Sequence, residues 1–146
     1  MTLHTASEGI SFAREMEEAT AGYYEELAKR FPAHAETFSA YAKANHKFVA
    51  NVQRTYYGVI TDGIEGCYAF RTLEPDDYVL DVEVGADADL ASALAKAIKN
   101  EETLVAYYKE AAEQSKGVMH DVPHAFLMVA KKKVARIEEL KALAAR

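Results

Sequence analysis

The sequence predicts an all-α protein, an antiparallel four-helix bundle in which one long crossover joins the second helix to the third. Two observations predict this class. Four long segments carry apolar residues at alternating steps of three and four, which is the spacing of one buried helix face. The segment between the second and the third, residues 59–87, contains three glycines and Pro75 and loses that spacing. The joins within each helix pair are short, so paired helices are expected to be antiparallel neighbours.

The first helix is predicted over residues 5–30. Thr5 and Glu8 match a capping box, in which the two side chains accept hydrogen bonds from backbone amides at the helix start. The helical pattern ends before Pro32, because proline disfavours helical backbone in the residue that precedes it. The predicted buried face consists of Ile10, Ala13, Glu17, Thr20, Tyr24, Leu27 and Phe31.

The second and third helices are predicted over residues 33–58 and 88–116. The buried face of the second contains Phe38, Ala42, Asn45, Val49, Val52 and Tyr56. The third begins at an aspartate that caps its first turn, either Asp87 or Asp89, and ends near Gly117. Its buried face contains Leu90, Leu94, Ala97, Glu101, Leu104, Tyr108 and Ala111.

The fourth helix is predicted over residues 121–145, with Asp121 as its cap and Pro123 in its first turn. Its buried face contains Phe126, either Val129 or Ala130, Lys133, Ile137, Leu140 and Ala144. The four helices and the crossover form one predicted domain over residues 1–146.

Composition limits the classes of function. The chain has 17 Lys and Arg against 23 Asp and Glu and a net charge of −6, without a basic stripe, so we expect no nucleic-acid partner. No segment is apolar for long enough to cross a membrane, and the N-terminal residues lack the pattern of a leader peptide. We therefore expect a cytoplasmic protein that does not bind membranes. Cys67 is the only cysteine, so a CxxC redox pair is excluded within the chain.

The sequence contains an internal repeat. EEATAGYYEELA begins at Glu17 and EETLVAYYKEAA begins at Glu101, which is 84 residues later. FSAYAKANHKF, from Phe38, also aligns with FLMVAKKKVAR, from Phe126, at an offset of 88. The first helix pair therefore matches the second pair in sequence.

On these residues the chain resembles the rubrerythrin-like branch of the ferritin-like superfamily over essentially its whole length. The strongest matches are the two E-x6-Y stretches, Glu17 to Tyr24 and Glu101 to Tyr108. The resemblance implies two helix hairpins related by a pseudo-twofold axis. It also implies a central site in which six carboxylate and histidine ligands hold two iron or manganese ions that reduce peroxide or oxygen.

The chain departs from this ligand pattern. Glu17 and Glu101 occupy the glutamate positions of the first and third helices, but the two Glu-x-x-His pairs are replaced by Asn45 with Phe48 and by Lys133 with Arg136. Four of the six ligands are therefore missing. Because a buried carboxylate without a partner is costly, we predict that Lys133, with Arg136 and the Asn45 amide, fills this degenerate di-metal site with an ion-pair network.

Other interpretations of these residues stay open. Lys131, Lys132 and Lys133 form a charge run, and a helix face through Ala130, Val134 and Ile137 would turn Lys133 outward. His120 and His124 have the spacing of a metal pair but flank a helix start, so exposed histidines are the simpler interpretation.

The predicted function is a non-catalytic binding or scaffolding protein without a cofactor, and no catalytic residue is assigned. The alternative is an iron- or manganese-dependent oxidoreductase that acts on peroxide or oxygen through a non-standard site with Glu17, Glu101 and a ligand such as His46. A third possibility is a small-molecule ligand at the bundle centre, in a pocket lined by Tyr24, Tyr108 and Phe48. A homodimer is expected, because the alternating stretch YVLDVEV needs a surface to cover it, on its own bundle or on a neighbour's.

Overall fold

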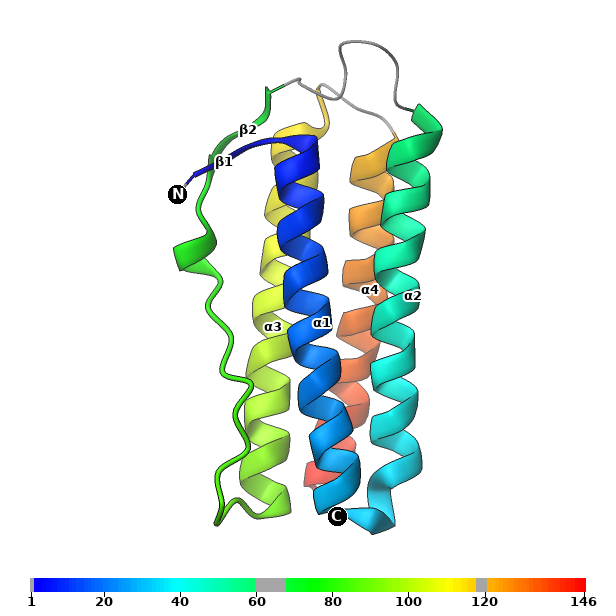
Figure 1. The fold of residues 1–146 in the computed structure, drawn as a ribbon, viewed down its shortest axis with the longest axis vertical. Coiled ribbons are helices and arrows are strands. Elements are labelled where there is room, and N and C mark those ends of the chain that lie inside the picture. Colours follow the sequence, from blue (N-terminus) through cyan, green and yellow to red (C-terminus); the bar gives the residue numbers. More distant parts are fainter. Residues whose placement is uncertain (1, 60–67, 118–120) are drawn as a thin grey trace.

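The computed structural model describes residues 2–59, 68–117 and 121–146. Four long helices dominate it (Figure 1): α1 Ala6–Arg30, α2 Ala35–Val59, α3 Leu90–Ser115 and α4 Asp121–Ala144. The predicted all-α class with four helices is confirmed. Two short strands, β1 Leu3–Thr5 and β2 Tyr68–Leu73, form a small antiparallel sheet at one end, which the sequence did not predict.

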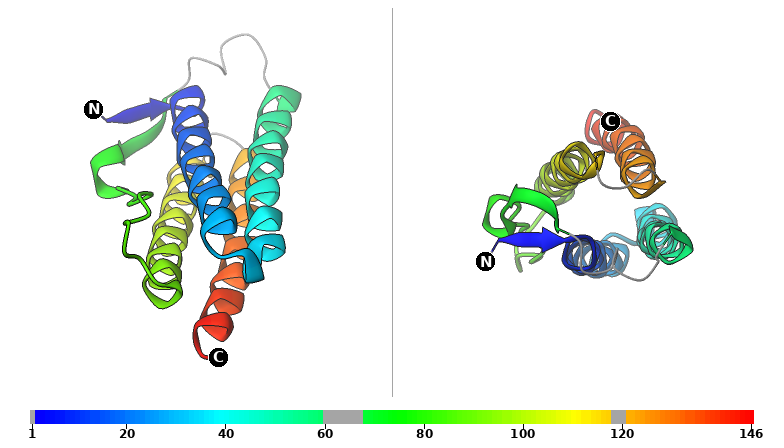
Figure 2. Two further views of the ribbon diagram at one scale, coloured as in Figure 1. Left: turned by 60° about the horizontal axis from the view of Figure 1, so that its bottom comes forward. Right: turned by 90° about the horizontal axis from the view of Figure 1, so that it is seen from above.

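Neighbouring helices run antiparallel around the bundle (Figures 1 and 2). Helix α1 packs mainly on α2, and α3 mainly on α4, while contacts of α2 with α4 and of α1 with α3 close the ring. In this arrangement α2 and α3 point the same way. The chain therefore has to return along the length of the bundle between them, and residues 68–89 run beside α3 over that length.

The alternating stretch at residues 78–84 packs on its own bundle. Leu80, Val82 and Val84 lie against the helix core, whereas Val79 is exposed. The Asn100 side chain holds this segment, because it accepts a hydrogen bond from the backbone N–H of Asp81 at 3.1 Å and donates to its carbonyl at 2.9 Å. The backbone of residues 78–84 does not form a strand, and the strand of this part of the chain is β2, which precedes them. The stretch therefore gives no evidence for a dimer.

The caps of α1 and α3 follow the prediction, whereas Asp121, which was predicted to cap α4, is the first residue of that helix. The capping box of Thr5 and Glu8 at α1 is confirmed. Of the two candidate caps of α3, Asp89 is the one that accepts a hydrogen bond from the Ser92 amide, at 2.8 Å. Ala144 was predicted on the buried face of α4 but is exposed, because it lies in the last turn of the helix.

The interior has two apolar clusters with a polar layer between them. On α1 the first cluster ends at Met16 and the second begins at Ala21. Glu17 and Thr20 lie between these residues and are fully buried. Each of the other three helices also contributes buried polar residues at this level, so the centre of the bundle is charged.

Candidate functional site

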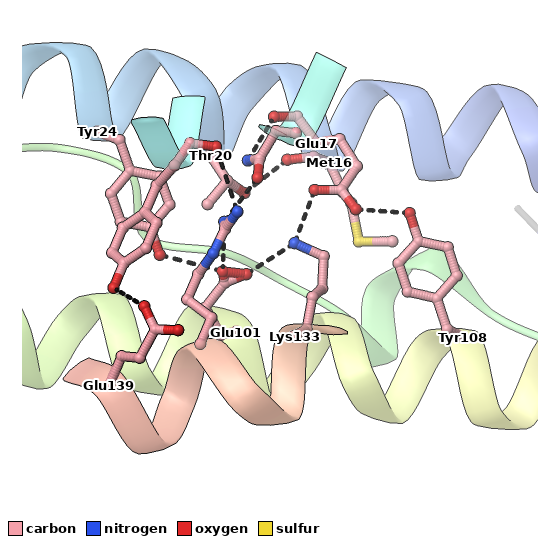
Figure 3. A network of polar contacts seen from close by, with 11 residues as sticks. Met16, Glu17, Thr20, Tyr24, Glu101, Tyr108, Lys133 and Glu139 are labelled. Carbon is pink, nitrogen blue, oxygen red and sulfur yellow. Dashed lines mark hydrogen bonds and ion pairs between the residues drawn. The ribbon is translucent and has the colours of Figure 1, made fainter. Parts of the chain in front are cut away.

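The site at the bundle centre consists of five buried polar residues from all four helices (Figure 3). They are Glu17 on α1, Asn45 on α2, Glu101 on α3, and Lys133 with Arg136 on α4. Lys133 and Arg136 are three residues apart, which places both on one face of α4. The regular apolar spacing of each helix turns these positions inward, so their charges meet inside the protein.

Lys133 bridges the two carboxylates. Its Nζ atom lies 2.8 Å from Oε1 of Glu17 and 2.8 Å from Oε1 of Glu101, and all three side chains are fully buried. Both contacts are ion pairs at hydrogen-bond distance, so the one ammonium is shared by the two carboxylates. Helix α4 therefore has the phase that turns Lys133 inward.

Two tyrosines bind the carboxylates in a reciprocal arrangement. The hydroxyl of Tyr24 on α1 donates to Oε2 of Glu101 on α3 at 3.0 Å. The hydroxyl of Tyr108 on α3 donates to Oε2 of Glu17 on α1 at 2.7 Å. Each tyrosine follows the glutamate of its own helix by seven residues and reaches the glutamate of the other helix. The repeat in the sequence thus gives matched hydrogen bonds in space.

Arg136 connects the carboxylates to α2. Its Nη1 atom donates to Oδ1 of Asn45 at 2.6 Å and to Oε2 of Glu101 at 3.2 Å, and its Nη2 atom donates to the carbonyl of Tyr41 at 3.3 Å. The Asn45 amide donates in turn to the backbone carbonyl of Glu17 at 3.2 Å. Arg136 is therefore fixed by three acceptors from two other helices.

Aromatic rings cover the cations. Phe48 lies with its ring centre 5.1 Å from Nζ of Lys133 and 5.4 Å from the guanidinium carbon of Arg136. The ring of Tyr41 lies 4.5 Å from that carbon. Such faces attract cations by their quadrupole and keep water away from them.

The two carboxylates differ in their electrostatics. Burial, together with the negative charge of Glu101, raises the pKa of Glu17 despite the opposing effect of Lys133. Burial also acts to raise the pKa of Glu101, but Lys133 and Arg136 together outweigh it, so the net pKa is lowered. Burial and the adjacent carboxylates hold the pKa of Tyr24 and of Tyr108 well above 10. Both tyrosines are thus hydrogen-bond donors at neutral pH.

The residues at this centre do not match a site for two divalent metal ions. The two central carboxylates, Glu17 and Glu101, have the ammonium of Lys133 between them. Arg136 and Asn45 supply a guanidinium and an amide, where the ligand set implied by the resemblance would require carboxylate or imidazole. Among the described residues, no group of three or more His, Cys, Asp and Glu side chains is placed to hold a metal ion.

The remaining predicted residues lie away from the centre. His46 and His124 are exposed, which removes His46 as a ligand beside Glu17 and Glu101. His120 and Cys67 lie outside the described residues. Tyr24, Tyr108 and Phe48, which were predicted to line a pocket, are buried and pack on the charged side chains.

Sequence reasoning missed Tyr41. Its carbonyl accepts from Arg136, and its hydroxyl donates to Glu139 at 2.9 Å. Its position one helical turn before Asn45 was a usable signal, because residues four apart share a helix face.

Comparison with family models, with curated proteins and with solved structures gives no match to this chain. None of the four helices, over the residues described, combines the length with the hydropathy that a membrane span requires.

Proposed function

We propose that this chain is a rubrerythrin-like member of the ferritin-like superfamily in which an ion-pair network replaces the di-metal centre. We further propose that it is a non-catalytic binding or scaffolding protein with a cytoplasmic location. One observation carries the proposal: Nζ of Lys133 lies 2.8 Å from a carboxylate oxygen of both Glu17 and Glu101, the two positions that match the family ligands.

The formal charges support this interpretation. Glu17 and Glu101 contribute two negative charges, and Lys133 and Arg136 contribute two positive ones, all in buried side chains. A di-metal site of the family type reaches neutrality with four carboxylates and two divalent cations instead. Since a net buried charge costs several kcal/mol, the interior can accommodate either composition, whereas a combination of the two that leaves a net charge is destabilising.

The reciprocal hydrogen bonds support the ferritin-like part of the proposal. Tyr24 with Glu101 and Tyr108 with Glu17 are the same contact made in both directions between α1 and α3, as the pseudo-twofold axis implied by the resemblance would require. Asn45 and Phe48 on α2 correspond to Lys133 and Arg136 on α4, and only the second pair is cationic. The hydrogen bonds between α1 and α3 are thus matched, whereas both cations of the site come from α4.

Metal analysis tests the proposal. The protein is produced with added iron and, separately, with added manganese, and its metal content is measured by mass spectrometry next to the variant Glu101→Gln. We expect far less than one ion per chain in both proteins. Stoichiometric metal in the natural protein that is lost in Glu101→Gln would instead support the oxidoreductase acting on peroxide or oxygen.

The partners are part of the same proposal. A homodimer is expected from the resemblance, and the mass in solution, measured by sedimentation, tests it. A small-molecule ligand beside Tyr24 and Tyr108 would be detected by mass spectrometry of the native protein before and after denaturation. A monomeric mass would contradict the homodimer, and an unchanged mass on denaturation would contradict the bound ligand.

A further inference from the structure

We propose that Lys133 and Glu17 are joined by an intramolecular isopeptide bond, with Glu101 as the group that transfers protons and Tyr108 as the donor that stabilises the intermediate. This inference goes beyond the proposed scaffolding role and does not rest on it. It assigns a self-modification reaction to the same four buried side chains, so its outcome is a covalent change that mass measurements detect directly.

The first argument is the position of the amine. Nζ of Lys133 lies 2.8 Å from Oε1 of Glu17, and both side chains are fully buried. Two reacting groups that are held in such contact have an effective concentration far above any achieved in solution. The Phe48 ring, 5.1 Å from Nζ, helps to exclude water. Because water is the product of amide formation, a dry interior favours the bond and protects it from hydrolysis.

The second argument identifies the carboxylate that reacts. Glu101 accepts three hydrogen bonds, from Lys133, Tyr24 and Arg136, and the guanidinium stabilises its ionised form. Glu17 accepts a hydrogen bond from Tyr108 at Oε2 and shares the Lys133 ammonium at Oε1, so its carboxylate has one cationic neighbour where that of Glu101 has two. The carboxyl carbon of Glu17 is therefore the better electrophile, while Glu101 stays ionised and able to accept a proton.

The third argument is the placement of the groups that would assist the reaction. The Tyr108 hydroxyl lies 2.7 Å from Oε2 of Glu17, where negative charge develops when an amine adds to the carboxyl carbon. Oε1 of Glu101 lies 2.8 Å from the same Nζ atom of Lys133 and accepts its proton. The amine and the oxyanion donor thus each contact an oxygen of the Glu17 carboxyl group, and the proton acceptor contacts the amine.

The reaction balances without an oxidant or a further reactant. The ammonium of Lys133 gives one proton to the ion-paired carboxylate of Glu17, and the neutral amine then adds to the carboxyl carbon. Glu101 takes the second proton from nitrogen and returns it to the departing hydroxyl. The carbon–nitrogen bond forms, one carbon–oxygen bond breaks, and one water molecule leaves. The ion pair of Glu101 with Arg136, at 3.2 Å, keeps the product neutral.

Mass spectrometry of the purified natural chain tests the proposal. The intact mass is measured in denaturant, directly after purification and after several days of incubation of the folded protein. We expect it to fall below the sequence mass by one water molecule. Tryptic digestion is expected to give a branched peptide that joins residues 15–29 to residues 133–136. Folded protein that retains the full sequence mass and yields only linear peptides would overturn the proposal.

Variants test the assigned roles. Lys133→Arg keeps the charge but has no primary amine, so it is expected to keep its full mass. Glu101→Gln and Tyr108→Phe are each expected to slow bond formation by about 100-fold, the usual effect of losing a proton-transfer group or an oxyanion donor. Cross-linking at the natural rate in folded Glu101→Gln would overturn the role of Glu101. Metal content and mass are separate measurements, so this proposal and the proposed function fail independently.

Discussion

The ammonium of Lys133 and the carboxylate of Glu17 form an ion pair 2.8 Å long in which neither side chain has any contact with solvent. Such a pair stabilises a fold less than its short distance suggests, because both charges had to leave water. Its main consequence is that each charge depends on the other, because the removal of either one leaves its partner buried without a counter-ion. The centre of this bundle is therefore expected to tolerate a change to the whole network better than the loss of one member.

Lys133→Met is expected to lower the free energy of unfolding by about 3–5 kcal/mol, because it leaves Glu17 and Glu101 buried without their shared cation. Urea denaturation followed by circular dichroism measures the loss. Lys131→Met is the control, since Lys131 is exposed on the same helix and its replacement is expected to change the free energy by less than about 0.5 kcal/mol. Equal effects of the two changes would contradict the central position of Lys133.

The hydroxyls of Tyr108 and Tyr24 are expected to contribute unequally. Tyr108→Phe removes the side-chain hydrogen bond of Glu17, whereas Tyr24→Phe leaves Glu101 with Lys133 and Arg136. Hydrogen bonds to charged groups contribute about 1.5–3 kcal/mol, so we expect Tyr108→Phe to cost an amount in that range and Tyr24→Phe to cost less. Urea denaturation of both variants measures the difference, and the reverse order would contradict this account.

Before the proposed bond between Lys133 and Glu17 forms, the stability of the folded protein is expected to depend on pH through two opposing terms. The folded-state pKa of Glu17 is raised above the ordinary 4.5. The contribution of Glu17 to the free energy of unfolding is therefore complete below pH 4.5 and is lost as the pH rises through the folded-state pKa. The folded-state pKa of Glu101 is lowered, so its contribution is complete above pH 4.5 and is lost as the pH falls through the folded-state pKa.

Glu17→Gln separates these terms. We expect this variant to lose the decrease in stability above pH 4.5 that titration of Glu17 causes, and to keep the decrease below pH 4.5 that titration of Glu101 causes. Melting temperatures across this range, with the exposed Glu18→Gln as control, give the two profiles. An unchanged slope above pH 4.5 in Glu17→Gln would show that Glu17 is not the group responsible.

Two glycines of α1 offer a matched test of the packing against β2. A Cβ atom at Gly9 would lie 2.5 Å from the Phe70 ring, whereas one at Gly22 would meet nothing within 4 Å. Gly22→Ala is expected to stabilise the protein by about 0.5–1 kcal/mol, since alanine is the better helix former. Gly9→Ala is expected to destabilise it, because Phe70 is buried and has to move. Thermal unfolding compares the two variants.

Restoring the family ligands tests the resemblance itself. The combined changes Asn45→Glu, Phe48→His, Lys133→Glu and Arg136→His place four new ligands around Glu17 and Glu101. We expect the folded variant to bind iron or manganese, near two ions per chain for a family-type site. The same variant with Lys133 retained is the control and is expected to bind less. A folded variant that binds no metal would contradict the alignment of α2 and α4.

The helices were predictable because their signals are local. Thr5 and Glu8 mark a helix start through contacts three residues apart, and apolar spacing alone indicated which face of each helix is buried. The choice between Asp87 and Asp89 was not predictable, since either side chain can accept the hydrogen bond and only the course of the preceding chain selects one. The pairing of β1 with β2 joins residues far apart in the sequence, so no local pattern indicated it.

The site likewise divides into features with local signals in the sequence and contacts between residues far apart in it. The four helices, the repeat, and the location of Glu17, Glu101 and Lys133 on buried helix faces follow from the amino-acid sequence. The packing of the helices places Lys133 between the two carboxylates and brings each tyrosine to the glutamate of the opposite helix. The physical reason is that the periodicity of the sequence determines only the direction in which a side chain points from the axis of its own helix. The neighbours it meets depend on how four helices are rotated and shifted against one another.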